Sequence, residues 1–113
     1  MNKYFFLIVF FALNISTIKA EKDRNNRNEI ALHHFMQGEF LLNQGNFALA
    51  VIEFQDALEA DPNASTIHVS IADAYRRLGK FKRAEDHLHI AIELDPDEKD
   101  ARQMPGQLYI SNK

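Results

Sequence analysis

One pattern restricts the fold of this chain more than any other: the sequence repeats itself with a spacing of 34 residues. The segment ALEADP at residues 57–62 returns as AIELDP at residues 91–96. A repeat of this length is typical of arrays in which one small helical unit stacks on the next. Other pairs at the same spacing are Gly45 and Gly79, Phe47 and Phe81, Ala50 and Ala84, Leu41 and Tyr75, and His34 and His68.

The apolar residues inside each unit follow the period of an α-helix. Phe47, Ala50 and Phe54 fall at steps of three and four residues, and Phe81, Ala84 and Leu88 repeat them. This spacing places the side chains on one face of a helix, so each unit is predicted to contain an amphipathic helix. A further helix is expected upstream in each unit, over about residues 30–43 and 64–77.

Glycine and proline mark the ends of these predicted helices. Gly45 and Gly79 follow the upstream helices, where a left-handed residue commonly ends an α-helix. Pro62 and Pro96 follow the second helices and cannot continue the backbone hydrogen-bond ladder. Each unit is therefore predicted to be a helix, a tight turn and a second helix.

Small and apolar residues recur at fixed positions within the two units. They are Gly38, Ala50, Phe54, Ala57 and Pro62 in the first, and Ala72, Tyr75, Ala84, Leu88, Ala91 and Pro96 in the second. On these residues the sequence resembles the tetratricopeptide repeat family, whose unit is a 34-residue helix-turn-helix. The resemblance implies an all-α fold: a short right-handed superhelical array of antiparallel helix-turn-helix repeats, with two full repeats and a C-terminal capping helix. The domain is then expected at 30–113, with repeat one at 31–64, repeat two at 65–98 and a partial repeat or cap at 99–113.

The partial third repeat is in register but broken. Ala101, Gly106 and Tyr109 stand at the repeat positions, whereas Pro105 replaces the usual Leu. Proline inside a helix costs about 3 kcal/mol, so a bent capping helix is expected. Because solenoids usually need about three repeats to bury a continuous core, we expect stabilisation by self-association or by a partner. The alternative is that the chain is a piece of a longer array.

The N-terminal 20 residues have the pattern of a secretory signal. Lys3 precedes an apolar run at residues 4–13, and a more polar stretch ends at Ala20. The protein is therefore expected to be exported, to a bacterial periplasm or the outside of the cell, with a mature chain that begins at Glu21. The alternative is an uncleaved N-terminal membrane anchor. Residues 21–29, EKDRNNRNE, are almost wholly polar and are expected to form a flexible leader.

Composition excludes several classes of function. The chain has a net charge of -3 and lacks the basic footprint of a nucleic-acid-binding protein. It contains no cysteine, which excludes disulfides and thiolate chemistry. No phosphate loop, dinucleotide fingerprint or nucleophile elbow occurs, so we expect neither an enzyme nor a cofactor.

The five histidines do not form a metal motif along any one helix. Neither His33 with His34 nor His87 with His89 has the i, i+4 spacing that puts two ligands on one face. No metal site is therefore predicted. His34 and His68, one repeat apart, are expected to stack between repeats.

In the family, the first helices of successive repeats line a concave surface that holds other proteins. The resemblance implies that this surface carries ten residues here: Leu32, Phe35, Glu39, Leu42, Asn43, Thr66, Val69, Asp73, Arg76 and Arg77. It would be apolar at one end and charged at the other, with Arg76 and Arg77 available to partner carboxylates. The alternative is that Leu32 and Phe35 pack under the leader or against a second subunit.

Some family members hold a C-terminal carboxylate in a Lys/Asn clamp. The two clamp positions in repeat one are Phe35 and Glu39 here, and Glu39 would repel a carboxylate. We therefore expect no binding of chaperone tails by such a clamp. The cations of the repeat-two turn, Arg76 to Arg83, are interpreted as a solvated cluster balanced by nearby acids, the alternative being a dock for an acidic partner or membrane.

Taken together, the sequence predicts an exported scaffold that binds a partner protein or peptide through the concave surface. One alternative is a membrane-tethered array that self-associates as a homo-oligomer. A second is a small-ligand or metal-binding protein that uses its histidines.

Overall fold

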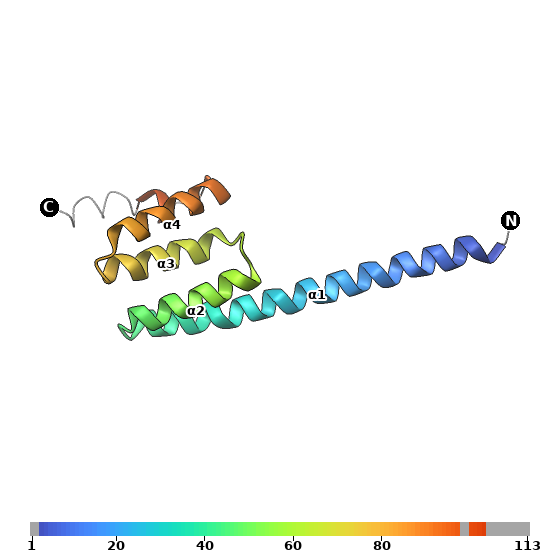
Figure 1. Ribbon diagram of the computed structural model, residues 1–113, viewed down its shortest axis with the longest axis horizontal. Coiled ribbons are helices and arrows are strands. Elements are labelled where there is room, and N and C mark those ends of the chain that lie inside the picture. The colour runs from blue at the N-terminus through green and yellow to red at the C-terminus, as the bar shows by residue number, and fades with distance from the viewer. Residues whose placement is uncertain (1–2, 98–99, 104–113) are drawn as a thin grey trace.

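The structure is a computed structural model that describes residues 3–97 and 100–103. Four helices follow one another: α1 (Lys3–Asn43), α2 (Phe47–Ala60), α3 (Ser65–Arg77) and α4 (Phe81–Leu94). Residues 100–103 are also helical, and no strand occurs within the described ranges. The all-α prediction and the two helix-turn-helix units are confirmed (Figure 1).

The two tight turns form at the predicted glycines. Gly45 and Gly79 have φ angles of 82° and 75°, in the left-handed region. After α1, Asn46 N–H donates to Leu41 C=O at 2.9 Å; after α3, Lys80 N–H donates to Tyr75 C=O at 2.8 Å. Because these bonds satisfy carbonyls that a helix end leaves open, both helices stop at the same place in the repeat.

Consecutive helices pack in an antiparallel stack, α1 on α2, α2 on α3 and α3 on α4 (Figure 1). The same three positions of the second helix are buried in both repeats: Ala50, Phe54 and Ala57 in one, and Ala84, Leu88 and Ala91 in the other. Ala101, within the helical residues 100–103, is fully buried in this core, whereas the capping helix as a whole stays a prediction. Residues 104–113, including Pro105 and Tyr109, lie outside the described residues.

In repeat one, the ring of Phe54 packs directly against Gly38, which has no side chain. A Cβ added to Gly38 on α1 would overlap the ring of Phe54 on α2. The equivalent positions in repeat two hold Ala72 and Leu88, both buried. Repeat one thus combines a larger residue on its second helix with a smaller one on its first, and repeat two does the opposite.

The prediction of a flexible leader at residues 21–29 is wrong. These residues belong to α1, which runs without a break from Lys3 and therefore starts far before residue 30. Neither proline nor glycine occurs between Lys3 and Gln37, and Glu, Lys and Arg are good helix formers, so nothing interrupts the backbone ladder. The polarity was predicted correctly, since all nine residues are exposed.

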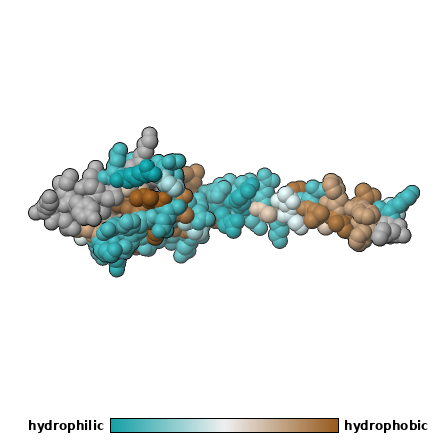
Figure 2. Space-filling view, turned by 90° about the horizontal axis from the view of Figure 1, so that it is seen from above, coloured by the Kyte–Doolittle hydropathy of each residue, from teal (hydrophilic) through white to brown (hydrophobic). Residues whose placement is uncertain are grey.

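The N-terminal part of α1 projects from the packed repeats, and the molecule measures 76 × 27 × 17 Å (Figure 1). Figure 2 shows an apolar surface over its N-terminal end, then a hydrophilic stretch before the packed repeats. By length and composition α1 is able to cross a membrane, a property that it shares with signal sequences. The apolar side chains from Tyr4 to Ile18 are all exposed.

Candidate functional site

Two recesses lie side by side along the surface between α1 and α3. The first, which we call the apolar recess, has a volume of about 200 Å³. It is lined by Asn28, Ala31, Leu32, Phe35, Asp61, Thr66 and Ile67. The second, which we call the acidic recess, has a volume of about 230 Å³. It is lined by Glu39, Leu42, Val69, Ser70, Asp73, Asp100 and Gln103.

Seven of the ten residues predicted for the concave surface line these two recesses. Leu32, Phe35 and Thr66 line the apolar recess; Glu39, Leu42, Val69 and Asp73 line the acidic one. Asn43, Arg76 and Arg77 line neither. The helical period explains the grouping, because Leu32, Phe35, Glu39 and Leu42 fall at steps of three and four on α1. Their role in binding stays a prediction.

The apolar recess is open to solvent; its exposed lining is mostly apolar, with Asn28, Asp61 and Thr66 at its border. Leu32 on α1 is 57% exposed, whereas Ala31 and Ile67 at its base are buried. Phe35 is partly buried and its ring lies 5.9 Å from that of Phe54, so the core holds it in place. A recess with a fixed aromatic wall and an exposed leucine can take up an apolar side chain.

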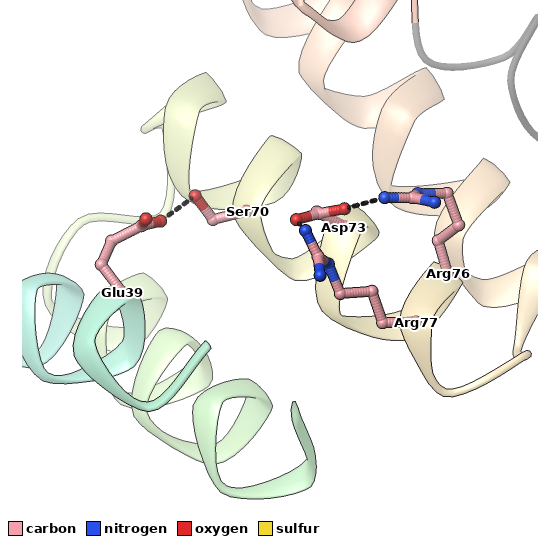
Figure 3. Close-up of polar contacts among 5 residues, drawn as sticks. All are labelled: Glu39, Ser70, Asp73, Arg76 and Arg77. Carbon is pink, nitrogen blue, oxygen red and sulfur yellow. Dashed lines mark hydrogen bonds and ion pairs between the residues drawn. The ribbon is translucent and has the colours of Figure 1, made fainter. Parts of the chain in front are cut away.

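Three polar residues of the acidic recess, Glu39, Ser70 and Asp73, are held by hydrogen bonds (Figure 3). Ser70 Oγ on α3 donates to Glu39 Oε1 on α1 at 2.6 Å, which joins the two helices across the surface. The two oxygens of Asp73 are occupied by arginines of its own helix: Arg76 donates to Oδ1 at 2.6 Å and Arg77 donates to Oδ2 at 3.3 Å. Figure 3 shows both guanidinium groups turned toward this carboxylate.

These contacts correct one expectation about the charged end. Arg76 and Arg77 were expected to be available to the carboxylates of a partner, but both pair with Asp73. Arg77 also lies over the ring of Phe47, 5.5 Å from its centroid. The spacing i, i+3 and i, i+4 on one helix face brings both arginines to Asp73, so each guanidinium already has a partner within the protein, with two positive charges sharing one carboxylate.

Two further cations of the repeat-two turn, Lys82 and Arg83, also have partners. Lys82 donates to Asp86 at 2.9 Å, and this contact raises the pKa of the lysine and lowers that of the aspartate. Arg83 lies over the ring of Tyr75, 5.7 Å from its centroid. These pairs support the interpretation of a solvated turn, and docking of an acidic partner stays the untested alternative.

The histidines pair within repeats, so the expected stacking of His34 on His68 is wrong. His34 Nδ1 lies 2.8 Å from Glu53 Oε2, and His68 Nδ1 lies 3.0 Å from His87 Nδ1. Both pairs span 19 residues and join the first helix of a repeat to its second. The hairpin therefore brings each first-helix histidine to a partner on its own second helix, not to the next repeat.

The two pairs differ in their electrostatics. Burial lowers the pKa of His68, an effect partly offset by a hydrogen bond to the backbone of Pro62. Burial also lowers the pKa of His87, and the neighbouring His68 lowers it further, against a raising effect of Asp86. Two imidazoles in contact favour the neutral state, whereas Glu53 offers His34 a negative partner.

A third residue, Asp56, joins His34 and Glu53 in a small cluster in repeat one that was not predicted from the sequence. The ligand atoms of His34, Glu53 and Asp56 all lie within 4.8 Å of one another. One imidazole nitrogen and two carboxylate oxygens suit a divalent transition metal such as zinc. The signal was the 19-residue spacing across the hairpin, which a search along single helices does not test.

Comparisons with known proteins agree with this architecture. The family description "Tetratricopeptide repeat" matches residues 41–112. Superkiller protein 3 of Schizosaccharomyces pombe is 32% identical over 79 residues, which are 70% of this chain and 6% of that protein. Protein CTR9 homolog of Arabidopsis thaliana is 27% identical over 92 residues, 81% of this chain and 8% of that protein. The chain thus spans less than a tenth of the length of these relatives.

Two similar solved structures are peptide complexes. The first TPR domain of Spaghetti (RPAP3), bound to the HSP90 peptide SRMEEVD, has a TM-score of 0.72 and 26% identity, covering 76% of this chain and 68% of that one. The second TPR domain of the same protein, bound to the same peptide, has a TM-score of 0.67 and 22% identity, covering 78% and 87%. The second likeness concerns the fold alone. From the family match over most of the packed repeats and from these folds, we conclude that this chain belongs to the tetratricopeptide repeat family, whose members typically act as non-catalytic scaffolds.

Proposed function

We propose that this chain is an exported interaction module that holds a peptide segment of a partner protein on the surface between α1 and α3. The observation that carries the proposal is the pair of adjacent recesses, one apolar and one acidic, lined by residues of both helices. A related domain at 26% identity binds a peptide, which supports the same class of function here.

The test is capture of partner proteins by the full-length chain in mild detergent, compared with a groove variant. Leu32→Ala combined with Thr66→Arg alters two exposed residues of the apolar recess and leaves the core intact. Partners that bind the surface should be lost from the variant and kept by the control Ile52→Ala, which changes an exposed residue of α2. Equal capture by both variants would refute the proposed surface.

Export rests on the N-terminal 20 residues. The apolar side chains from Tyr4 to Ile18 are all exposed, as expected of a segment that enters a membrane during translocation. N-terminal sequencing of the protein recovered from its cell should give a chain that begins at Glu21. Recovery of the chain with its apolar segment would support the alternative of a retained anchor.

The unbroken course of α1 would give that alternative, a membrane-tethered array, a defined geometry. If residues 4–18 stay in a bilayer, the same helix carries one wall of both recesses, so the repeats are held by a rigid stalk rather than a flexible leader. The polar stretch 21–29 would measure about 14 Å at the helical rise of 1.5 Å per residue. Self-association of such tethered arrays is tested by sedimentation of the full-length chain in detergent, where a monomer would exclude it.

The cluster of His34, Glu53 and Asp56 supports a second candidate function, binding of a divalent metal. Titration with zinc would give a stoichiometric site that His34→Ala abolishes. His68→Ala is the matched control. The equivalent of Asp56 in repeat two is the aliphatic Ile90, so the pair of His68 and His87 lacks the third ligand. Zinc binding that is insensitive to His34→Ala would rule out this cluster.

A further inference from the structure

The charges around the acidic recess are unequally compensated. Three carboxylates line it, those of Glu39, Asp73 and Asp100. Asp73 is held by two arginines, and both of its oxygens are occupied. Glu39 accepts one hydrogen bond through Oε1 from a neutral hydroxyl, and within residues 3–97 and 100–103 no ion pair neutralises Glu39 or Asp100.

Counted together, the three carboxylates and the two arginines leave one net negative charge, and the carboxylates without an ionic partner among the described residues are Glu39 and Asp100. Glu39 is partly buried, so its charge is screened less than that of a fully exposed residue. The two nearest arginines line neither recess, because they fold back onto Asp73. A carboxylate placed here would meet like charge, whereas an ammonium or guanidinium group would gain a charge-assisted hydrogen bond.

The apolar recess lies a short distance along the same surface. Leu32 and Glu39 are seven residues apart on α1, which is about 10 Å along the helix axis. About three residues of an extended peptide span this distance. One peptide can therefore place an apolar side chain against Leu32 and Phe35 and a second side chain against Glu39.

We propose that the ligand of this surface is a peptide segment that carries an apolar side chain and, about three residues from it, a lysine or arginine. The inference rests on the proposed function and assigns it a ligand chemistry. The apolar side chain enters the apolar recess, and the cation lies between Glu39 and Asp100. The preference is opposite in sign to an acidic peptide such as SRMEEVD, to which the structurally similar Spaghetti domain is bound.

The experiment is selection of random twelve-residue peptides on the immobilised full-length chain in mild detergent. We expect enrichment of an apolar residue and, three positions away, of Lys or Arg. The same selection on the double variant Glu39→Gln, Asp100→Asn should keep the apolar preference and lose the cationic one. The control Glu59→Gln makes the same charge change on an exposed residue of α2 that lines neither recess, and it should keep both preferences.

A selected peptide then gives a quantitative measure. Replacing the Lys or Arg of this peptide by Glu should weaken its binding to the native chain at least tenfold. The double variant should discriminate less between the two peptides. Enrichment of Asp or Glu, or an apolar preference without a charge preference, would overturn the inference and leave peptide binding standing. Enrichment of no peptide would defeat the proposed function together with it. Circular dichroism of each variant checks that the helices are retained.

Discussion

Repeat one and repeat two share a backbone plan but differ at the positions that face neighbours and solvent. Both have a left-handed glycine in the turn and three buried residues at the same steps on the second helix. At equivalent exposed positions of the second helix, repeat one carries Leu49 and Ile52, whereas repeat two carries Arg83 and Asp86. The shared positions therefore specify the fold, and the divergent ones give each repeat its own surface.

The divergence continues on the first helices. Met36 and Phe40 of repeat one are 62% and 59% exposed, and their equivalents in repeat two are Ser70, which bonds to Glu39, and Ala74, which is fully buried. α3 packs on the hairpin of α1 and α2 that precedes it. No such hairpin precedes α1 in the part of the chain that the structure describes. The same repeat position thus serves as an interface in repeat two and as surface in repeat one.

The largest effect is expected from removing the central aromatic ring of repeat one. Phe54→Ala should lower the free energy of unfolding by about 3–5 kcal/mol, because Phe54 is fully buried and its loss leaves a cavity. Thermal and urea unfolding followed by circular dichroism measures this change. Ile52→Ala on the exposed side of the same helix should change it by less than about 0.5 kcal/mol, and a similar loss in both variants would contradict the assigned core.

A smaller effect tests the size match between the two repeats. Gly38→Ala should cost about 1–3 kcal/mol, because the new methyl group overlaps Phe54. Adding Phe54→Leu reproduces the Ala72 and Leu88 combination of repeat two and should restore at least half of the loss. No recovery in the double variant would show that the two positions are not coupled.

The histidine pairs should make the stability of the repeats respond to pH. The folded pKa values of His68 and His87 lie below 6.5, so the unfolded chain binds protons first as the pH falls. Their contribution is fully present above the unfolded pKa and is lost as the pH falls below about 6.5 toward the folded values. The midpoint of thermal unfolding should therefore drop between pH 7.5 and 5.5, and less so in His87→Gln. A matching change in His33→Gln, whose ring is exposed, would argue against the pair as the cause.

The smallest effect concerns the carboxylate that two arginines already neutralise. Asp73→Asn should lower the free energy of unfolding by less than about 1 kcal/mol, because the pairs are partly exposed to solvent. Its effect on a cationic peptide should be smaller than that of Glu39→Gln. Isothermal titration with a selected peptide compares the two variants. A larger loss of affinity in Asp73→Asn than in Glu39→Gln would show that Asp73, not Glu39, is the carboxylate that binds the cation.

Local patterns were sufficient to predict most of the helical framework. The helix expected at residues 64–77 is found at Ser65–Arg77, and both turns contain the predicted left-handed glycines. The extent of α1 was missed because the polarity of residues 21–29 was equated with flexibility. Hydrophobic burial decides whether a segment packs, but an exposed segment without proline or glycine can still be helical.

Contacts between helices were harder to predict than the helices themselves. The helical period predicts which residues share a face, and seven of the fourteen residues that line the two recesses were among those predicted; their role in binding stays a prediction. The pairing of Arg76 and Arg77 with Asp73, and of His34 with Glu53, depends on side-chain positions that a repeat pattern does not contain. These local pairs decide which charges a ligand meets, and therefore the sign of the charge expected on the bound peptide.

The central claim is that a peptide is held between α1 and α3. Backbone amide NMR shifts of the full-length chain in detergent, with and without a selected peptide, test it most directly. The largest shifts are predicted within residues 31–43 and 66–77, with little change at Leu49, Ile52, Arg83 and Asp86. Shifts concentrated at those four outer positions, with residues 31–43 unaffected, would contradict it.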